Sequence, residues 1–258
     1  MWVVRGWVAW GNHVMPTFVY TQLLRCRPAH GRYAARMPLL VIVRHGQASF
    51  GSADYDVLSP VGRQQALQTA SALRAAGLEA AHVVTGSLRR QRHTAEAIGD
   101  AFGLSPTVDD RWNEYDADAV LAHHSDSAQR LEHPEGPSAA PQSPREFQRV
   151  LERALEAWIK AGDDSPSPET WPAFNARVGE ALKAAGGASA GTTVIVSSGG
   201  VIGAIAVALI GVDPISFPRL NRVTINCGIT RVITGSTGTT LVSFNEQGHL
   251  TTGMRTYR

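Results

Sequence analysis

Short aliphatic runs alternate with longer mixed stretches of polar and apolar residues from Met37 onward. The run LLVIV, residues 39–43, is continuously apolar, as is typical of a strand buried on both faces of a parallel sheet. Residues 81–84 and 193–197 repeat this pattern. Because helical patterns separate these strands, we predict an α/β fold, a three-layer αβα sandwich with a mostly parallel central sheet.

The mixed stretches carry helix signals. Ser59 followed by Pro60 predicts an N-cap and a first helical position, and Gly77 predicts the end of that helix. Between them an apolar stripe runs through Leu67, Ala70 and Leu73. Further helices are predicted at 88–102, 145–160 and 201–210, and a hairpin at 228–244.

Two proline-rich polar segments, residues 133–144 and 161–172, flank the helix at 145–160. Such composition predicts loops. We therefore expect one domain over residues 37–258, with a small lid insertion at about 115–172 that selects the substrate. No aromatic pattern in this insertion identifies that substrate.

Residues 1–36 differ from the rest of the chain, because they hold five arginines, no acidic residue and no sustained apolar periodicity. The segment is too interrupted for a membrane span and lacks the parts of a secretory signal. We expect it to be a disordered leader or an artefact of start-codon choice, with Met37 as the true start. A targeting or anchoring segment is the alternative.

Charge and cysteine content narrow the class of protein. The formal net charge is +2, from 24 basic and 22 acidic residues, and removing the five leader arginines makes it 19 − 22 = −3. A mildly acidic body without a basic stripe argues against nucleic-acid binding. Two cysteines without CxxC spacing make neither a disulfide framework nor a zinc site, so we expect a cytoplasmic protein with no membrane partner. A homodimer is an alternative to a monomer.

Polar residues stand directly after three predicted strands, where open α/β sheets bind their ligands. Arg44, His45 and Gly46 follow the first strand, and Arg90 lies on the helical turn after the second. After the third strand comes SSGG, residues 197–200, whose amides open the next helix. Two guanidinium groups and a helix N-terminus at one point predict a site for a phosphate dianion.

Five segments in order then resemble the histidine phosphatase superfamily, also called phosphoglycerate mutase-like. RHG alone would be a weak signal, but the ordered set covers nearly all of residues 37–258. The start RHGQASF and the closing SFNEQGHLTTGMRTYR are similar to a bacterial branch of the family. The five segments are RHGQ (44–47), LSPVGRQQA (58–66), SLRRQRHTA (87–95), WNEYD (112–116) and VSSGGVI (196–202).

The resemblance implies a small phosphorylated substrate, no cofactor and no metal. His45 would attack phosphorus and carry the phosphoryl group, and Glu114 would act as general acid and base. Arg44 and Arg90 would neutralise the phosphoryl oxygens. Ser198 and Gly199 would complete the phosphate-binding set.

The chain departs from the family at Ser198, where the family pattern VSHGG has a second histidine. A serine hydroxyl offers a neutral hydrogen bond in place of a charge-assisted one, which is about twice as strong. Losing one such donor typically costs on the order of a hundredfold to a thousandfold in rate. His93 or His249 could supply the missing charge.

Several residues have plainer interpretations. Taken alone, His45 is most simply a buried histidine whose hydrogen bonds are satisfied within the core, and arginines on a helix are usually solvated. The pattern S-x-L-x-R-A selects Arg90, although the register leaves Arg89 and Arg92 open. Asp116 and Asp118 are alternatives to Glu114 for the role of general acid and base. The acidic and histidine-rich run at 116–133 is a weak candidate for a metal site, because its residues do not have the spacing of a known set of metal ligands.

Three functions follow in order. The first is metal-independent phosphomonoester hydrolysis, for which Ser198 predicts weak activity. The second is a mutase-like phosphotransferase, although RHGQASF lacks the RHGxSxWN pattern of classical mutases. The third is a binding protein for a phosphorylated ligand, which would not need His45 and Glu114.

Overall fold

The computed structural model describes residues 38–49, 56–132, 144–187, 191–236 and 238–257. Contacts divide the chain into Met1–Arg36 and Met37–Arg258, and the described residues all belong to the second unit. The predictions for the leader and for the loop at 133–143 therefore lie outside the described residues. No helix among the described residues is long and apolar enough to cross a membrane.

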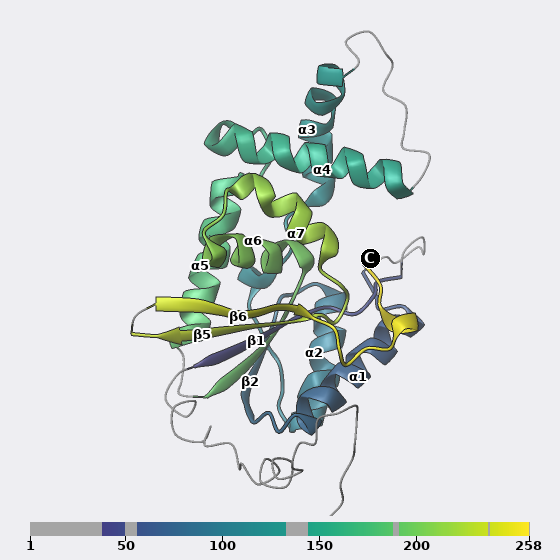
Figure 1. Ribbon diagram of the computed structural model, residues 1–258, viewed down its shortest axis with the longest axis vertical. Helices are drawn as coiled ribbons and strands as arrows, with labels where there is room; N and C mark the ends of the chain where they lie inside the picture. Colours follow the sequence, from purple (N-terminus) through teal and green to yellow (C-terminus); the bar gives the residue numbers. More distant parts are fainter. Residues whose placement is uncertain (1–37, 50–55, 133–143, 188–190, 237, 258) are drawn as a thin grey trace, which may run out of the picture. The chain divides into compact units, whose positions relative to one another are not determined.

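A six-stranded sheet forms the centre of this unit, in the order β3-β2-β4-β1-β5-β6 (Figure 1). The first four strands in that order are mutually parallel, and β5 and β6 add antiparallel at one edge. The mostly parallel α/β fold predicted from the sequence is confirmed. The strands are β1 (Leu39–Arg44), β2 (Ala80–Thr85), β3 (Thr107–Val108), β4 (Thr192–Ser197), β5 (Ile229–Gly235) and β6 (Gly238–Glu246).

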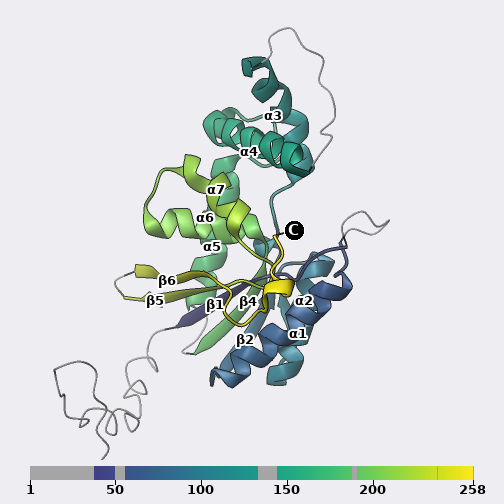
Figure 2. The ribbon, with the colours of Figure 1, turned by 45° about the vertical axis from the view of Figure 1, so that its right-hand side comes forward.

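Helices cover both faces of the sheet because its two central strands, β1 and β4, are apolar and buried on both sides. Val41 and Val43 of β1 pack with α1 (Pro60–Ala75) and α2 (Arg89–Phe102), whereas Leu40 and Ile42 pack on the other face. That face is covered by α5 (Trp171–Gly187), α6 (Gly199–Ile210) and α7 (Phe217–Val223) (Figure 2). The alternation along β1 thus divides the core into two layers.

Helix α1 begins as its sequence predicts. Ser59 caps it by accepting a hydrogen bond from the Gly62 amide at 3.0 Å, and Pro60 is the first helical residue. Gly77 follows the helix in a left-handed conformation, with φ of +74°.

Two further helices, α3 (Ala117–Glu132) and α4 (Pro144–Ala161), pack against each other above α5 and α7 (Figure 1). The helix predicted at 145–160 corresponds to α4, whereas no local sequence signal predicted α3, α5 or α7. An aromatic cluster of Tyr115, Trp158, Trp171, Phe174 and Phe217 joins α4, α5 and α7, with ring centroids 4.7–6.5 Å apart. Packing in this cluster supports helices that local sequence does not specify.

Candidate active site

The backbone of His45 is fixed from both sides at the end of β1. Its amide donates to the Ser197 carbonyl of β4 at 2.9 Å. On the other side, the Asn226 side chain donates to the His45 carbonyl at 3.1 Å, and the Cys227 amide donates to the Arg44 carbonyl at 3.0 Å. These contacts hold a side chain that is only 4% exposed.

The imidazole of His45 has its two nitrogens in different surroundings. Nδ1 lies 2.7 Å from the Gly46 carbonyl oxygen, which can only accept, so Nδ1 carries the proton. Nε2 therefore has a lone pair, and Arg90 Nε donates to it at 3.2 Å. Burial, followed by the charges of Arg90 and Arg44, holds the pKa of His45 well below its usual value. The ring is neutral and has the electronic form of a nucleophile.

Arg90 is the arginine of α2 that contacts the His45 ring. Its guanidinium also pairs with Asp56, with 2.5 Å between the nearest nitrogen and oxygen. The second oxygen of Asp56 accepts from the Arg89 amide at 2.7 Å, at a helix start where Leu88 offers no side-chain cap. Asp56 thus caps α2 and restrains Arg90, a role that the sequence analysis did not anticipate.

Arg44 is held by carbonyl oxygens from the last third of the chain. Its guanidinium donates to Thr224 O and, at 3.1 Å, to Tyr257 O. A Cβ added at Gly199 would lie 3.4 Å from Arg44 Nε, so the arginine lies against the start of α6. The closing residues of the chain therefore form part of the site.

Glu114 reaches the same helix start. Its Oε2 accepts from the Gly200 amide at 3.0 Å, and a Cβ at Gly200 would lie 2.2 Å from Oε1. The loop that carries Glu114 is fastened by Arg177, which donates to the Asn113 carbonyl at 2.8 Å. Burial raises the pKa of Glu114 above its usual value, although the Gly200 amide and both arginines oppose that effect. The raised pKa suits a proton donor.

Ser198 is fully buried at the N-cap of α6, and its side chain makes no capping hydrogen bond. Instead its hydroxyl accepts from Gln91 Nε2 at 2.8 Å. The same nitrogen donates to the Trp112 carbonyl at 3.1 Å. The sequence analysis missed Gln91, although one signal was present, since the pattern S-x-L-x-R-A has alanine at this position.

The two histidines considered as substitutes for the missing one make other contacts. His249 Nε2 lies 3.0 Å from Thr69 Oγ1 of α1. His93 lines a pocket of about 300 Å³ between α1 and α2, together with Arg63 and Glu96. Neither ring contacts His45 or Ser198, so the structure gives no support to the hypothesis that either supplies the charge.

The competing acidic residues start a helix. Asp116 Oδ1 accepts from the Ala119 amide at 2.9 Å, which caps α3, and Asp118 is exposed in its first turn. Among the described residues, no group of three or more His, Cys, Asp or Glu side chains could hold a metal ion. Asp126 and His133 of the same run lie outside the described side chains.

The strand ends thus bring Arg44, His45, Arg90, Glu114 and Ser198 together around the first turn of α6. A neutral imidazole nitrogen, two guanidinium groups and a carboxyl group with a raised pKa lie in one site, in which His45 is buried and the other three residues are partly exposed. This arrangement can bind an anion and carry out nucleophilic and acid–base chemistry on it.

Comparisons with known proteins show which family the chain resembles. The model of the histidine phosphatase superfamily (branch 1) matches residues 40–247. A glucosyl-3-phosphoglycerate phosphatase from Mycolicibacterium vanbaalenii is 30% identical over 195 residues, which are 72% of this chain and 80% of that protein. A probable phosphoglycerate mutase GpmB from Erwinia tasmaniensis is 28% identical over 204 residues, 74% of this chain and 82% of the relative.

The fold is also found among solved structures. A phosphoserine phosphatase from Entamoeba histolytica superposes with a TM-score of 0.59 at 20% identity, over 83% of this chain and all of that one. Since the family match runs from β1 to β6, the resemblance noted in the five sequence segments is confirmed: the chain belongs to the histidine phosphatase superfamily.

Proposed function

We propose that this protein hydrolyses phosphomonoesters through a phosphohistidine intermediate on His45. The observation that carries the proposal is the state of the His45 ring, whose Nδ1 donates to Gly46 O at 2.7 Å while Nε2 keeps its lone pair. A buried histidine with a purely structural role has no need of an arginine that donates to that lone pair at 3.2 Å.

In the first step, Nε2 of His45 forms a bond to phosphorus and the bond from phosphorus to the ester oxygen breaks. Glu114 gives its proton to the leaving alkoxide, a role supported by the raised pKa of its carboxyl group. Arg44 and Arg90 neutralise the phosphoryl oxygens as charge redistributes in the transition state. Arg90 would exchange its contact with Nε2 for contacts with the phosphoryl group.

In the second step, a water molecule attacks the phosphohistidine. The Glu114 carboxylate takes a proton from this water, the bond between Nε2 and phosphorus breaks, and inorganic phosphate leaves. His45 is again neutral and Glu114 again protonated. No step calls for a metal ion, because the two guanidinium groups supply the positive charge.

The test is phosphate release from an aryl phosphate by the full chain in the presence of a chelator. We expect turnover by the parent protein and none by His45→Ala. His82→Ala, which changes an exposed histidine of β2, is the matched control and should keep parental activity. Quenching the parent with ³²P-labelled substrate in alkaline SDS should trap an acid-labile, alkali-stable phosphoprotein that His45→Ala lacks. Equal turnover by His45→Ala and the parent would refute the proposal.

Phosphoryl transfer to a second substrate hydroxyl is the alternative, favoured by the relatives named as probable phosphoglycerate mutases. It shares the phosphohistidine and differs in what accepts the phosphoryl group. Incubation with 3-phosphoglycerate separates the two, because a phosphatase yields glycerate and inorganic phosphate whereas a mutase yields 2-phosphoglycerate.

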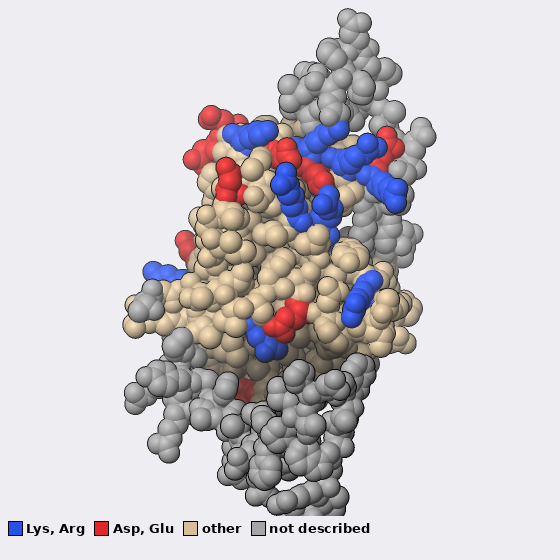
Figure 3. Space-filling model, in the orientation of Figure 1, with Lys and Arg blue, Asp and Glu red and all other residues tan. Residues whose placement is uncertain are grey.

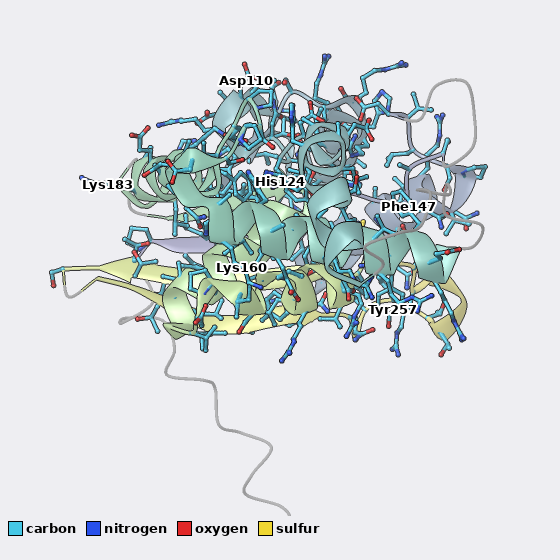
Figure 4. The ribbon with its side chains drawn as sticks, turned by 90° about the horizontal axis from the view of Figure 1, so that it is seen from above. Asp110, His124, Phe147, Lys160, Lys183 and Tyr257 are labelled. Carbon is cyan, nitrogen blue, oxygen red and sulfur yellow. The ribbon has the colours of Figure 1, made fainter. Side chains whose placement is uncertain are left out.

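We further propose that α3 and α4 act as the lid that selects the substrate. In Figure 4, α4 crosses the molecule above the sheet, with Phe147 in its first turn on the side where Tyr257 lies. Lys and Arg side chains lie over α4 and α7 among Asp and Glu side chains (Figure 3), and their excess in these two helices would attract an anionic substrate. Glucosyl-3-phosphoglycerate, named for one relative, is a sugar phosphate to include in the first substrate screen.

A further inference from the structure

Gln91 and Ser198 form a buried pair beside His45. Both residues are fully buried, and Gln91 Nε2 lies 2.8 Å from Ser198 Oγ. Gln91 comes from α2 and Ser198 from the start of α6, so the contact joins two of the strand ends that make the site.

The direction of this hydrogen bond is set by a third group. Gln91 Nε2 also lies 3.1 Å from the Trp112 carbonyl oxygen, which can only accept. The amide nitrogen must face that carbonyl, because the opposite orientation would place two acceptor oxygens together. The remaining amide proton then points at Ser198 Oγ, and the serine acts as acceptor in this bond.

A serine that accepts a hydrogen bond in this way still has its own proton to donate. No described residue accepts that proton, and the hydroxyl makes no helix-capping bond. N-cap serines usually bond to an amide of the first turn, so the side chain is turned from its ordinary local role.

The hydroxyl also has a definite place in the site. Arg44 pairs with Ser197 in the register of β1 and β4, so the next residues, His45 and Ser198, follow on adjacent strand ends. The neighbouring Gly199 lies against Arg44, and the Gly200 amide contacts Glu114. Ser198 thus stands on the strand end next to that of His45, in the region where the phosphoryl group would bind.

We propose that Gln91 is a positioning residue that orients the Ser198 hydroxyl as a hydrogen-bond donor to the phosphoryl group. This inference rests on the proposed function for the identity of the anion, but the orientation of the hydroxyl follows from the contacts of Gln91 and Trp112.

The test is a double-mutant cycle of Gln91→Met and Ser198→Ala in the full chain. Methionine keeps the length and apolar volume of glutamine but removes the donor. Two quantities are measured for all four proteins: kcat/KM for an aryl phosphate, and the Kd of inorganic phosphate by calorimetry. Thermal unfolding establishes that each variant is folded.

We expect Ser198→Ala to lower kcat/KM and to raise the Kd of phosphate, each by roughly tenfold or more. When Ser198 is present, Gln91→Met should lower kcat/KM and raise the Kd of phosphate about fivefold. When alanine replaces Ser198, the same substitution should change each quantity less than about twofold, because Gln91 acts through the serine. Equal losses in the two backgrounds would overturn the inference, since a general packing role adds independently. Full activity and phosphate affinity of Gln91→Met would also overturn it.

The phosphate readout separates this inference from the proposed function. If the parent binds phosphate with the expected coupling but releases none from the aryl ester, the positioning role stands and phosphatase activity does not. If the parent releases phosphate and the coupling is absent, the reverse holds. A parent that neither binds inorganic phosphate nor releases it from the aryl ester refutes both.

Discussion

At the scale of single residues, burial and two arginines decide which groups carry protons. They lower the pKa of His45 and burial raises that of Glu114, so the histidine is kept neutral and the carboxyl group is favoured in its protonated form. Both shifts move the groups toward the forms that nucleophilic attack and proton donation require.

Arg90→Gln tests the electrostatic part of this statement. Removing the positive charge beside Nε2 raises the pKa of His45, so the imidazolium persists to higher pH and the acid limb of the kcat/KM profile moves to higher pH. The plateau should also fall by roughly a hundredfold to a thousandfold. Arg92→Gln, an exposed residue of the same helix, should change neither. An acid limb at the parental pH in Arg90→Gln would show that Arg90 does not act on the His45 charge.

At the scale of elements, the first turn of α1 packs against the loop that follows β1. A Cβ added at Gly62 would lie 2.1 Å from the Gln47 carbonyl oxygen, and one at Gly46 would lie 2.4 Å from Gly62 O. Two backbones in such close contact leave no room for a side chain on either. The contact fixes the loop directly after His45.

Gly62→Ala should therefore destabilise the protein, although alanine favours helices. Overpacking of this kind costs about 1–3 kcal/mol, which exceeds the gain of up to about 1 kcal/mol in helix propensity. Gly179→Ala is the matched control, because it is also helical and its Cβ would meet no atom within 4 Å. Urea unfolding should give a lower free energy of unfolding for Gly62→Ala than for the parent, and an equal or higher one for Gly179→Ala. If both variants gained stability, the close contact would be refuted.

At the scale of the whole molecule, the fold favours the neutral form of three histidines within the part of the chain that the structure describes. Burial is the main cause of the lowered pKa of His45, His124 and His249. When the protein unfolds below about pH 6.5, these side chains take up protons that the folded state does not bind. The free energy of unfolding should therefore fall as the pH falls below that value. Glu114, with its raised pKa, opposes the trend as a single group.

His124→Gln tests this dependence away from the active site. His124 is buried and its Nε2 lies 2.9 Å from Ser165 Oγ, a contact that a glutamine amide can replace. Between pH 7.5 and 5.5, urea unfolding should give a smaller loss of stability for the variant than for the parent. The same loss in both proteins would mean that His124 takes up its proton in the folded state as readily as in the unfolded chain.

Much of the sheet and its neighbouring helices could be predicted, because local patterns specify them. The aliphatic run at 39–43, the Ser59–Pro60 start of α1 and the glycines after β4 each carry a signal within a few residues. Helices α3 and α5 could not be predicted in this way. Pro and Ser precede Trp171 in what reads as a loop, and α5 depends on burying Trp171 and Phe174 in the aromatic cluster.

By itself, the sequence determined the α/β class, the family and the strand ends on which Arg44, His45 and Ser198 stand. Only the tertiary structure decided how these groups are arranged. Asp56 restrains Arg90, the Tyr257 carbonyl holds Arg44, and Gln91 donates to Ser198. These partners are 34, 213 and 107 residues apart along the chain. A local pattern encodes which element forms, whereas proton positions and side-chain orientations depend on contacts that exist only after distant segments have packed.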